Sequence, residues 1–177
     1  MTQQKWFDEL VQIVPYDQQW PKLFEQEAIT IKNVFAENRL VRIEHYGSTS
    51  IQGLIAKPII DILIGLTEFS LLPEEKQALL NLGYQYIGKA LRYERFFLRK
   101  IGQQNFHLAL VRYDGAIWHR NIVARDYLRA HPKKASEYAQ LKQQALTDGH
   151  RTVLEYAAYK EDFIEELVRK AKYWKTK

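Results

Sequence analysis

One aspartate interrupts an otherwise apolar run in the segment KPIIDILIGL, residues 57–66. A run that is apolar at nearly every position is typical of a strand covered on both faces, in the interior of a sheet. Because side chains alternate along a strand, Asp61 must face the side opposite to Ile60 and Ile62. A lone carboxylate in such a place is costly unless it is paired with a cation or binds a metal ion. The segment therefore predicts an inner strand that carries one polar group on a single face.

Hydrophobic periodicity in the rest of the chain predicts an α/β (α+β) domain. Apolar residues spaced three and four apart predict helices over residues 17–38, 70–84, 116–132, 132–149 and 151–174. Alternating or continuous apolar runs predict strands over residues 40–47, 57–66, 93–100 and 105–113. This order favours a small mixed β-sheet of four to six strands with helices packed on it.

The domain organisation follows from the length of 177 residues and the absence of internal repeats or low-complexity linkers. A chain of this length is typical of one domain. We therefore expect a single domain over residues 1–177. Its motif-bearing core would lie at about residues 40–112, and its helical C-terminal region at about residues 116–175.

The composition limits the cellular setting. The chain has no cysteine, which excludes disulfides and thiolate metal sites and fits the cytoplasm. The first twenty residues lack the pattern of a signal peptide, and no apolar run approaches the ~18 residues of a membrane helix. We expect a cytoplasmic protein with no membrane partner.

Positive charge is concentrated in the middle of the chain. The net charge is +5, but residues 89–134 hold eleven Lys or Arg and three Asp or Glu, a local balance of +8. Such a segment favours an anionic partner, such as a nucleotide, a phosphate ester or nucleic acid, or else forms a solvated basic face. No RNA-recognition pattern is present, so we do not expect nucleic acid to be the partner.

A glycine-serine turn precedes the strand that carries Asp61. Gly47 can turn tightly and approach a ligand closely. The hydroxyl of Ser48 and the amides of Gly47, Ser48, Thr49 and Ser50 can donate to a phosphate. Two structural alternatives remain for Asp61, namely an ion pair with a nearby Arg or Lys and the capping of a loop. No GxGxxG or GxxxxGK[ST] pattern supports a Rossmann fold or a P-loop.

The turn and the aspartate together resemble a known pattern. A Gly-Ser turn, twelve further residues and an Asp in an apolar strand are similar to the hGS…Dh[DE]h motif of the nucleotidyltransferase superfamily. The segment GSTSIQGLIAKPIID, residues 47–61, resembles the GST-x-x-x-GL-x-AKP-x-ID segment of the GrpB family. Later blocks of that family resemble RFFLRK, HLALV and RDYLRAHP, together with Tyr159-Lys160 and Phe163-Ile164. The resemblance extends from about Val14 to Ala171.

The resemblance implies a nucleotidyltransferase-like fold and metal-dependent phosphate chemistry. In active members of the superfamily, two carboxylates of the Asp-x-Asp/Glu pair bind divalent metal, so Asp61 would be the catalytic aspartate and a ligand to Mg²⁺. This chain departs from the pattern at Leu63, which replaces the second carboxylate. It departs again at Ala109, where the family often has the second histidine of His-x-His.

Three further residues are candidates for the same site. Glu44 stands in the strand before the turn and could be the second metal ligand. Lys57 either reaches the phosphates or solvates its loop. His107 either contacts the ligand or is a hydrogen-bonded histidine of the core.

Four arginines could bind the phosphates. Arg95 and Arg99 share one face of a predicted strand and could bind phosphate oxygens bidentately. Arg125 and Arg129 stand four apart on a predicted helix and could converge on the same anion. Each of them could instead be a surface charge or the partner of a carboxylate.

Three hypotheses for function follow. The chain could be a Mg²⁺-dependent enzyme that transfers a nucleotidyl group to a hydroxyl or amine. It could instead be a binding module for a nucleotide or another phosphorylated small molecule without chemistry, as Leu63 and Ala109 suggest. Because GrpB-like domains also occur fused to dephospho-coenzyme A kinase, a coenzyme A-related ligand is included by analogy. The third hypothesis is a structural or interaction domain in which Asp61 is only ion-paired.

Overall fold

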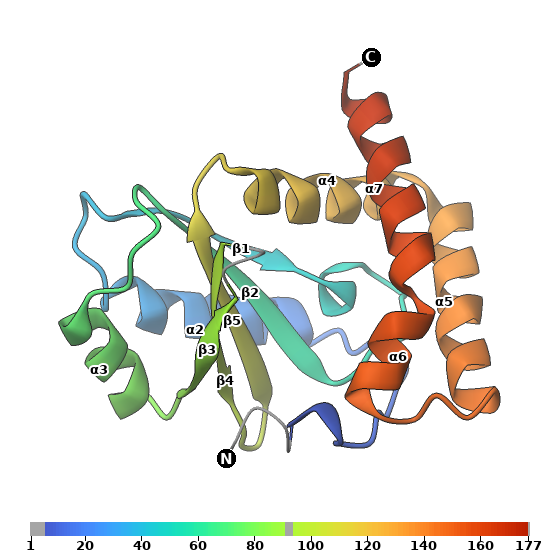
Figure 1. Cartoon of the computed structure of the whole chain (residues 1–177), viewed down its shortest axis with the longest axis horizontal. Coiled ribbons are helices and arrows are strands. Elements are labelled where there is room, and N and C mark those ends of the chain that lie inside the picture. The colour runs from blue at the N-terminus through green and yellow to red at the C-terminus, as the bar shows by residue number, and fades with distance from the viewer. Residues whose placement is uncertain (1–5, 91–93, 177) are drawn as a thin grey trace.

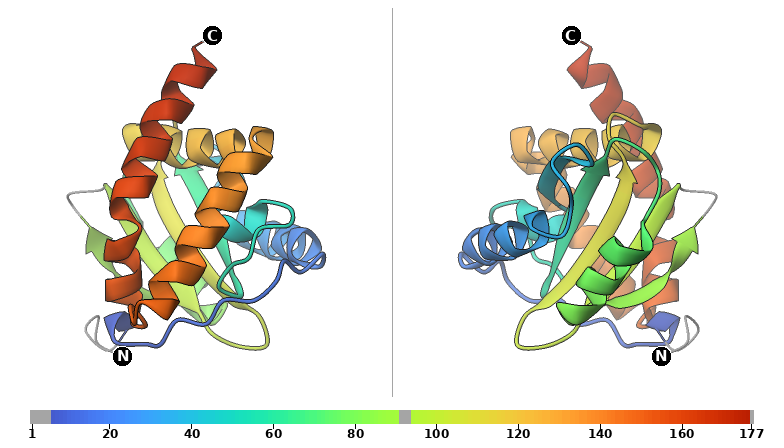
Figure 2. Two further views of the ribbon diagram at one scale, coloured as in Figure 1. Left: turned by 90° about the vertical axis from the view of Figure 1, so that its right-hand side faces the viewer. Right: turned by 90° about the vertical axis from the view of Figure 1, so that its left-hand side faces the viewer.

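A five-stranded sheet with helices on both faces forms the centre of the molecule in a computed structural model that describes residues 6–90 and 94–176 (Figures 1 and 2). The strands are β1 (Leu40–Tyr46), β2 (Ile59–Leu66), β3 (Gln85–Ala90), β4 (Arg95–Lys100) and β5 (Asn105–Arg112). The helices are α2 (Trp20–Lys32), α3 (Pro73–Asn81), α4 (Ala116–Ala130), α5 (Pro132–Thr147), α6 (Val153–Tyr159) and α7 (Glu161–Lys175), with a 3₁₀ turn η1 (Ser48–Ser50).

The sheet is mixed, with strand order β1-β2-β5-β4-β3. Strands β2 and β5 are parallel, whereas every other neighbouring pair is antiparallel. The predicted α/β fold with four to six strands is confirmed, and β2 is an inner strand as the apolar run predicted. None of the helices among the described residues is long and apolar enough to cross a membrane.

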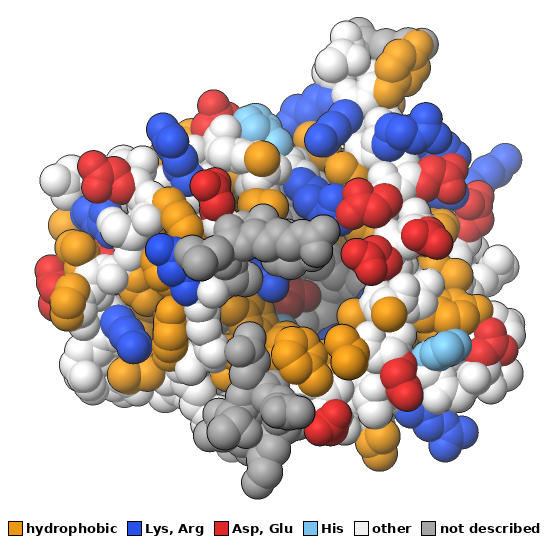
Figure 3. Space-filling model, in the orientation of Figure 1, with side chains coloured by type: hydrophobic (Ala, Val, Ile, Leu, Met, Phe, Trp, Pro, Cys, Tyr) orange, Lys and Arg blue, Asp and Glu red, His pale blue; other side chains and the backbone are white. Residues whose placement is uncertain are grey.

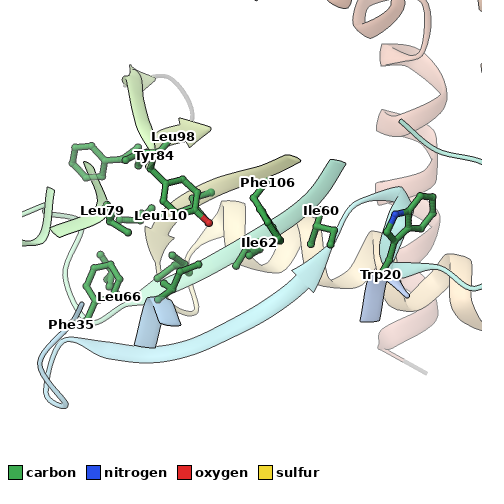
Figure 4. Close-up of a cluster of buried hydrophobic side chains, with 14 of the residues drawn as sticks. Trp20, Phe35, Ile60, Ile62, Leu66, Leu79, Tyr84, Leu98, Phe106 and Leu110 are labelled. Carbon is green, nitrogen blue, oxygen red and sulfur yellow. The ribbon is translucent and has the colours of Figure 1, made fainter. Parts of the chain in front are cut away.

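One face of the sheet carries the main apolar core. Ile60 and Ile62 of β2 point to this face together with Phe106 and Leu108 of β5, under α2 and α3 (Figure 4). Helix α2 begins at Trp20, and Pro21 stands in its first turn, where a missing N–H costs nothing. Each fully buried large side chain contributes about 1.5–3 kcal/mol, so this face holds the sheet in place.

The opposite face is covered by α4, α5, α6 and α7 and is partly polar. Leu63 and Ala109 pack against Trp118 and Ile122 of α4. One residue row further along the strands, the apolar cover gives way to Asp61 and its neighbours. The alternation of β2 therefore separates a fully apolar face from a face with a polar site.

Two elements differ from the expectations. Strand β3 was not predicted, because its sequence QYIGKA contains Gly88 at an irregularity in the pairing with β4, and glycine weakens a strand pattern. The predicted helix over residues 151–174 is instead two helices. They are divided at Lys160, whose φ of −95° and ψ of −4° stay close to helical values. The apolar stripe therefore continues across the break, so the hydrophobic periodicity of the sequence could not reveal that the helix is interrupted.

Candidate functional site

A row of polar side chains crosses the helix-covered face of the sheet. Tyr46, Asp61, His107 and Arg99 are successive neighbours in the strand register, from β1 through β2 and β5 to β4. Cross-strand neighbours point to the same face, so all four project toward α4–α7. The space-filling view shows this side of the molecule hollowed between the sheet and the terminal helices, with charged side chains inside the hollow (Figure 3).

Gly47 and Asp61 lie in direct contact. A Cβ atom placed on Gly47 would stand 2.3 Å from Asp61 Oδ2, closer than nonbonded atoms approach. The backbone of Gly47 also has a φ of +70°, which favours glycine. The glycine therefore allows the turn to pack on the carboxylate, and the turn and the aspartate form one site.

His107 holds the other side of the aspartate. Its Nδ1 atom lies 3.3 Å from Asp61 Oδ1. The His107 ring is enclosed by Phe97 and Trp6, whose ring centroids lie 5.0 and 6.0 Å away. The Asp61 side chain keeps 28% of its surface exposed, so it can still contact a small molecule.

Thr49 and Ser50 support the turn from inside. The Thr49 hydroxyl donates to the carbonyl oxygen of Ile59 at 3.1 Å and therefore accepts from His45 Nε2 at 3.0 Å. Ser50 Oγ donates to the carbonyl oxygen of Gly47 at 2.6 Å. The third hydroxyl of the turn, that of Ser48, lies beside the ammonium group of Lys142.

Arg125 and Arg129 brace the turn from α4. Arg125 Nη1 donates to Glu44 Oε2 at 2.7 Å and to the His45 carbonyl oxygen at 3.0 Å. Arg129 donates through Nε and Nη2 to the carbonyl oxygen of Ser50, at 3.1 and 2.8 Å. Both arginines thus bind the protein itself in this conformation.

Three lysines gather around the turn and Asp61. Lys142 of α5 is 1% exposed, and its Nζ atom lies 3.3 Å from Ser48 Oγ and also donates to the carbonyl oxygen of Ile55. Burial lowers the pKa of Lys142 to about 7 and that of Lys160 to about 8, against the opposing attraction of Asp61 for Lys160. Burial likewise lowers the pKa of Lys57, which Asp61 partly offsets.

Lys142 and Lys160 were not among the residues predicted for this site. Both stand in predicted helices, where a lysine is usually solvated. A signal was present for Lys142, which follows Tyr138 by four residues and precedes Ala145 by three, and both of these are buried. A lysine inside the apolar stripe of a predicted helix therefore indicated that the side chain of Lys142 is buried.

Arg99 is a buried cation with unused donors. Its side chain is 3% exposed, and Nη2 donates to Glu9 Oε1 at 2.7 Å. The Nε and Nη1 atoms of Arg99 are buried without a hydrogen-bond partner among the described residues, as is Nε of Arg95. An unpaired buried guanidinium donor is costly, so these groups suit an anionic ligand.

The same face holds room for a small molecule. A cavity of about 600 Å³ lies between the sheet and α6–α7, with Arg95, Phe97 and Trp6 in its wall. Phe97 and Trp6 also enclose His107, so the cavity adjoins the polar row. A second cavity, of about 810 Å³, lies by Ser50 and Arg129 at the turn.

The donor set around Asp61 does not fit a metal ion held by the protein alone. Leu63 stands on the same face of β2 and is fully buried under α4. Glu44, the predicted second ligand, accepts from Arg42 at 2.9 Å and from Arg125 at 2.7 Å. Within residues 6–90 and 94–176, no group of three or more His, Asp or Glu side chains could hold a metal ion. Mg²⁺ usually takes one or two carboxylates together with waters and phosphate oxygens, so it would need a ligand to bring it.

Comparisons with known proteins identify the chain's relatives. Residues 10–170 match the family described as GrpB protein. The UPF0157 protein YqkA of Bacillus subtilis is 32% identical over 166 residues, which are 93% of this chain but 48% of that protein. The chain thus spans about half the length of this relative. The glutamate-rich protein GrpB of Alkalihalophilus pseudofirmus is 30% identical over 164 residues, 88% of this chain and 92% of that one.

One solved structure agrees with the sequence relatives. The crystal structure of the conserved protein GrpB from Enterococcus faecalis superposes with a TM-score of 0.82 at 32% identity, over 92% of this chain and 99% of that chain. A weak similarity, with a TM-score of 0.48 and 11% identity, links 80% of this chain to 44% of a cytoplasmic RNA terminal U-transferase.

Proposed function

This chain belongs to the GrpB family, and we propose that it binds a phosphorylated small molecule, such as a nucleotide, between the Gly47–Ser50 turn, Asp61 and the terminal helices. The observation that carries the proposal is a set of buried cations at the turn and along the polar row of the sheet. Lys142 and Arg99 are almost fully buried. Like charges destabilise one another in a low-dielectric interior, so an anion among them would be stabilising.

The turn supplies donors for one end of such a ligand. Ser48 Oγ lies beside Lys142 Nζ, and together they can hold a phosphate oxygen through charge-assisted hydrogen bonds. Arg99 contributes two guanidinium donors without partners among the described residues. The Thr49 and Ser50 hydroxyls would keep the turn in shape rather than contact the ligand.

The adjoining cavity would take the rest of the ligand. Its wall includes Phe97 and Trp6, whose ring centroids lie 5.1 Å apart. Aromatic rings in such a place suit a planar group, and a nucleobase is one candidate. A phosphorylated molecule with an aromatic or apolar body therefore fits the site better than inorganic phosphate alone.

A second candidate function is nucleotidyl transfer. The contact between Gly47 and Asp61 favours it, because the resemblance to nucleotidyltransferases implies that a Gly-Ser turn and an aspartate share the site. Leu63 weighs against it, since a two-metal arrangement needs a second carboxylate. In this candidate, Asp61 would contact Mg²⁺ that the triphosphate brings with it, and the metal would neutralise charge on the phosphates.

A thermal-shift screen of the full chain tests the proposal. The panel holds pyrophosphate, nucleoside triphosphates, coenzyme A and sugar phosphates, each with EDTA and with Mg²⁺. A ligand at a hundredfold excess over its Kd would add about 2.7 kcal/mol to the free energy of unfolding. Lys160→Gln should reduce the shift. Lys170→Gln, which removes an exposed lysine of α7 paired with Glu166, should leave it unchanged.

The outcomes separate the candidates. If no member of the panel stabilises the chain under either condition, the binding proposal is wrong. A shift only with Mg²⁺ and a triphosphate, together with release of pyrophosphate from a labelled nucleotide, would favour transfer. Stabilisation by a phosphorylated ligand without turnover would favour the binding module.

A further inference from the structure

We propose that Lys142 and Lys160, rather than a metal ion, neutralise the phosphate at this site, so that it binds a dianionic phosphate group without Mg²⁺. This inference rests on the proposed function. It assigns the ligand's charge and the groups that balance it, neither of which follows from the family.

The two ammonium groups converge on one ring. Lys142 Nζ lies 4.6 Å and Lys160 Nζ 5.9 Å from the centre of the Tyr138 ring. Lys142 Nζ donates to the Ile55 carbonyl oxygen and lies beside Ser48 Oγ. Lys160 stands at the break between α6 and α7, and its Nζ atom lies 4.0 Å from the Tyr156 ring centre. Lys160 is therefore the residue at which α6 ends and α7 begins.

The charge of the site matches a dianion. The charged groups that act on one another around the three lysines are Lys57, Lys142, Lys160 and Arg99 with Asp61 and Glu9, while Arg95 lies further along the adjoining cavity. Four cations against two carboxylates leave two positive charges when every lysine is protonated. A metal ion would add charge to a site that already has an excess. Of the two carboxylates, Glu9 already accepts from Arg99, and Asp61 lies 3.3 Å from His107 Nδ1.

The protonation state supplies a measurable signature. Because burial lowers the pKa of Lys142 to about 7 and that of Lys160 to about 8, both are partly neutral in the free site near pH 8. A bound dianion favours their charged forms and raises both pKa values. The titratable and charged groups that face the two lysines are Asp61, Lys57, Tyr138 and Tyr156. Binding near pH 8 should therefore take up protons. Near pH 6 both lysines are already charged, so this uptake should vanish, and a phosphate group that is still protonated should release its proton instead.

Isothermal titration calorimetry of the full chain with pyrophosphate and with an adenine nucleotide tests the inference. Each is titrated in EDTA and in excess Mg²⁺, in two buffers of different ionisation enthalpy, near pH 6 and near pH 8. We expect binding in EDTA at least as tight as in Mg²⁺, with proton uptake near pH 8 only. Lys160→Gln should weaken binding about tenfold in EDTA, the loss typical of one charge-assisted contact.

The controls keep the inference separate from the proposed function. Lys170→Gln removes an equal charge from the exposed surface of α7 and should bind like the parent chain. Binding that requires Mg²⁺, or that takes up no protons near pH 8, overturns the inference but leaves phosphate binding intact. Absence of binding by both probes in both solutions overturns the inference. The proposed function fails with it only if no member of the thermal-shift panel stabilises the chain. Because these readouts use the parent chain, they do not depend on whether a buried-lysine variant folds.

Discussion

The carboxylate of Asp61 occupies the space that a side chain at Gly47 would need, since a Cβ there would lie 2.3 Å from Asp61 Oδ2. Gly47, the last residue before the η1 turn, and Asp61 of the inner strand therefore depend on each other, because a side chain at position 47 would collide with the carboxylate. The turn can take its observed shape only while position 47 has no side chain, and the carboxylate keeps its place for the same reason.

Gly47→Ala should destabilise the chain and weaken ligand binding. The alanine methyl would clash with Asp61. The backbone of the alanine would also have to keep a φ of +70°, a strained conformation that costs about 1–3 kcal/mol by itself. We expect the free energy of unfolding, measured with guanidinium chloride, to fall by more than this strain alone. The thermal shift with the best ligand of the panel should disappear.

Gly53→Ala is the matched control for this change. Gly53 has a similar φ of +77°, but nothing lies within 4 Å of its Cβ position. It should therefore report the cost of a positive φ without the clash. The extra loss at position 47 measures the contact with Asp61 together with the ψ of −175° at Gly47, a conformation almost confined to glycine. Equal losses of stability in the two variants would refute the coupling.

Lys142→Met should change how stability depends on pH. The folded-state pKa of Lys142, about 7, lies below its ordinary value of 10.5, so between these values the unfolded chain binds a proton that the folded chain does not. Stability from this group therefore rises with pH across that window, by at most about 1.4 kcal/mol per pH unit. The unfolding free energy of the parent chain relative to Lys142→Met should rise from pH 7 to pH 10. An exposed lysine changed in the same way, Lys170→Met, should give a flat difference over most of this range.

His45→Gln should remove part of the acid sensitivity. Burial lowers the pKa of His45 to about 4 from 6.5, although Asp61 acts in the opposite direction. Between these values the unfolded chain is protonated at His45 and the folded chain is not, so stability falls as pH falls from 6.5 toward 4. The glutamine amide can still donate to Thr49 but cannot titrate. Chemical unfolding at pH 7 and pH 4.5 should show a smaller loss in the variant, and equal losses would contradict the assignment.

The strands around the site could be predicted from the sequence, because the side chains of a strand point alternately to the two faces of the sheet and the residue types follow that alternation. The face of Asp61 follows from Ile60 and Ile62 alone. Strand β3 could not be predicted this way, since Gly88 interrupts its pattern where the pairing with β4 is irregular. The sequence therefore predicts a strand where the pairing is regular, and it fails to predict one where the backbone is irregular.

The cations of the site were harder to predict than its turn. Gly47, Ser48 and Asp61 lie close together in sequence, so spacing alone relates them. Lys142 and Lys160 reach the site only after α5, α6 and α7 fold onto the sheet. The apolar stripe around Lys142 indicates that this lysine is buried, but not which site it enters. Arg125 and Arg129 show the reverse case, since their spacing indicated a shared anion while both bind backbone carbonyl groups of the turn region.

Leu63→Asp tests whether this strand can regain the carboxylate pair of the nucleotidyltransferase pattern. Leu63 is fully buried against Trp118 and Ile122, so the change loses about 1.5–3 kcal/mol of apolar burial and adds the several kcal/mol of burying a charge beside Asp61. Against a typical total stability of about 5–15 kcal/mol, we expect much of the variant to be unfolded by circular dichroism. Leu63→Asn, of similar shape and without charge, separates the charge from the lost packing. Because α4 covers position 63, Mg²⁺ should rescue neither variant; selective rescue of Leu63→Asp by Mg²⁺ would instead show that the two carboxylates can share a metal ion, and would revive the two-metal mechanism for this fold.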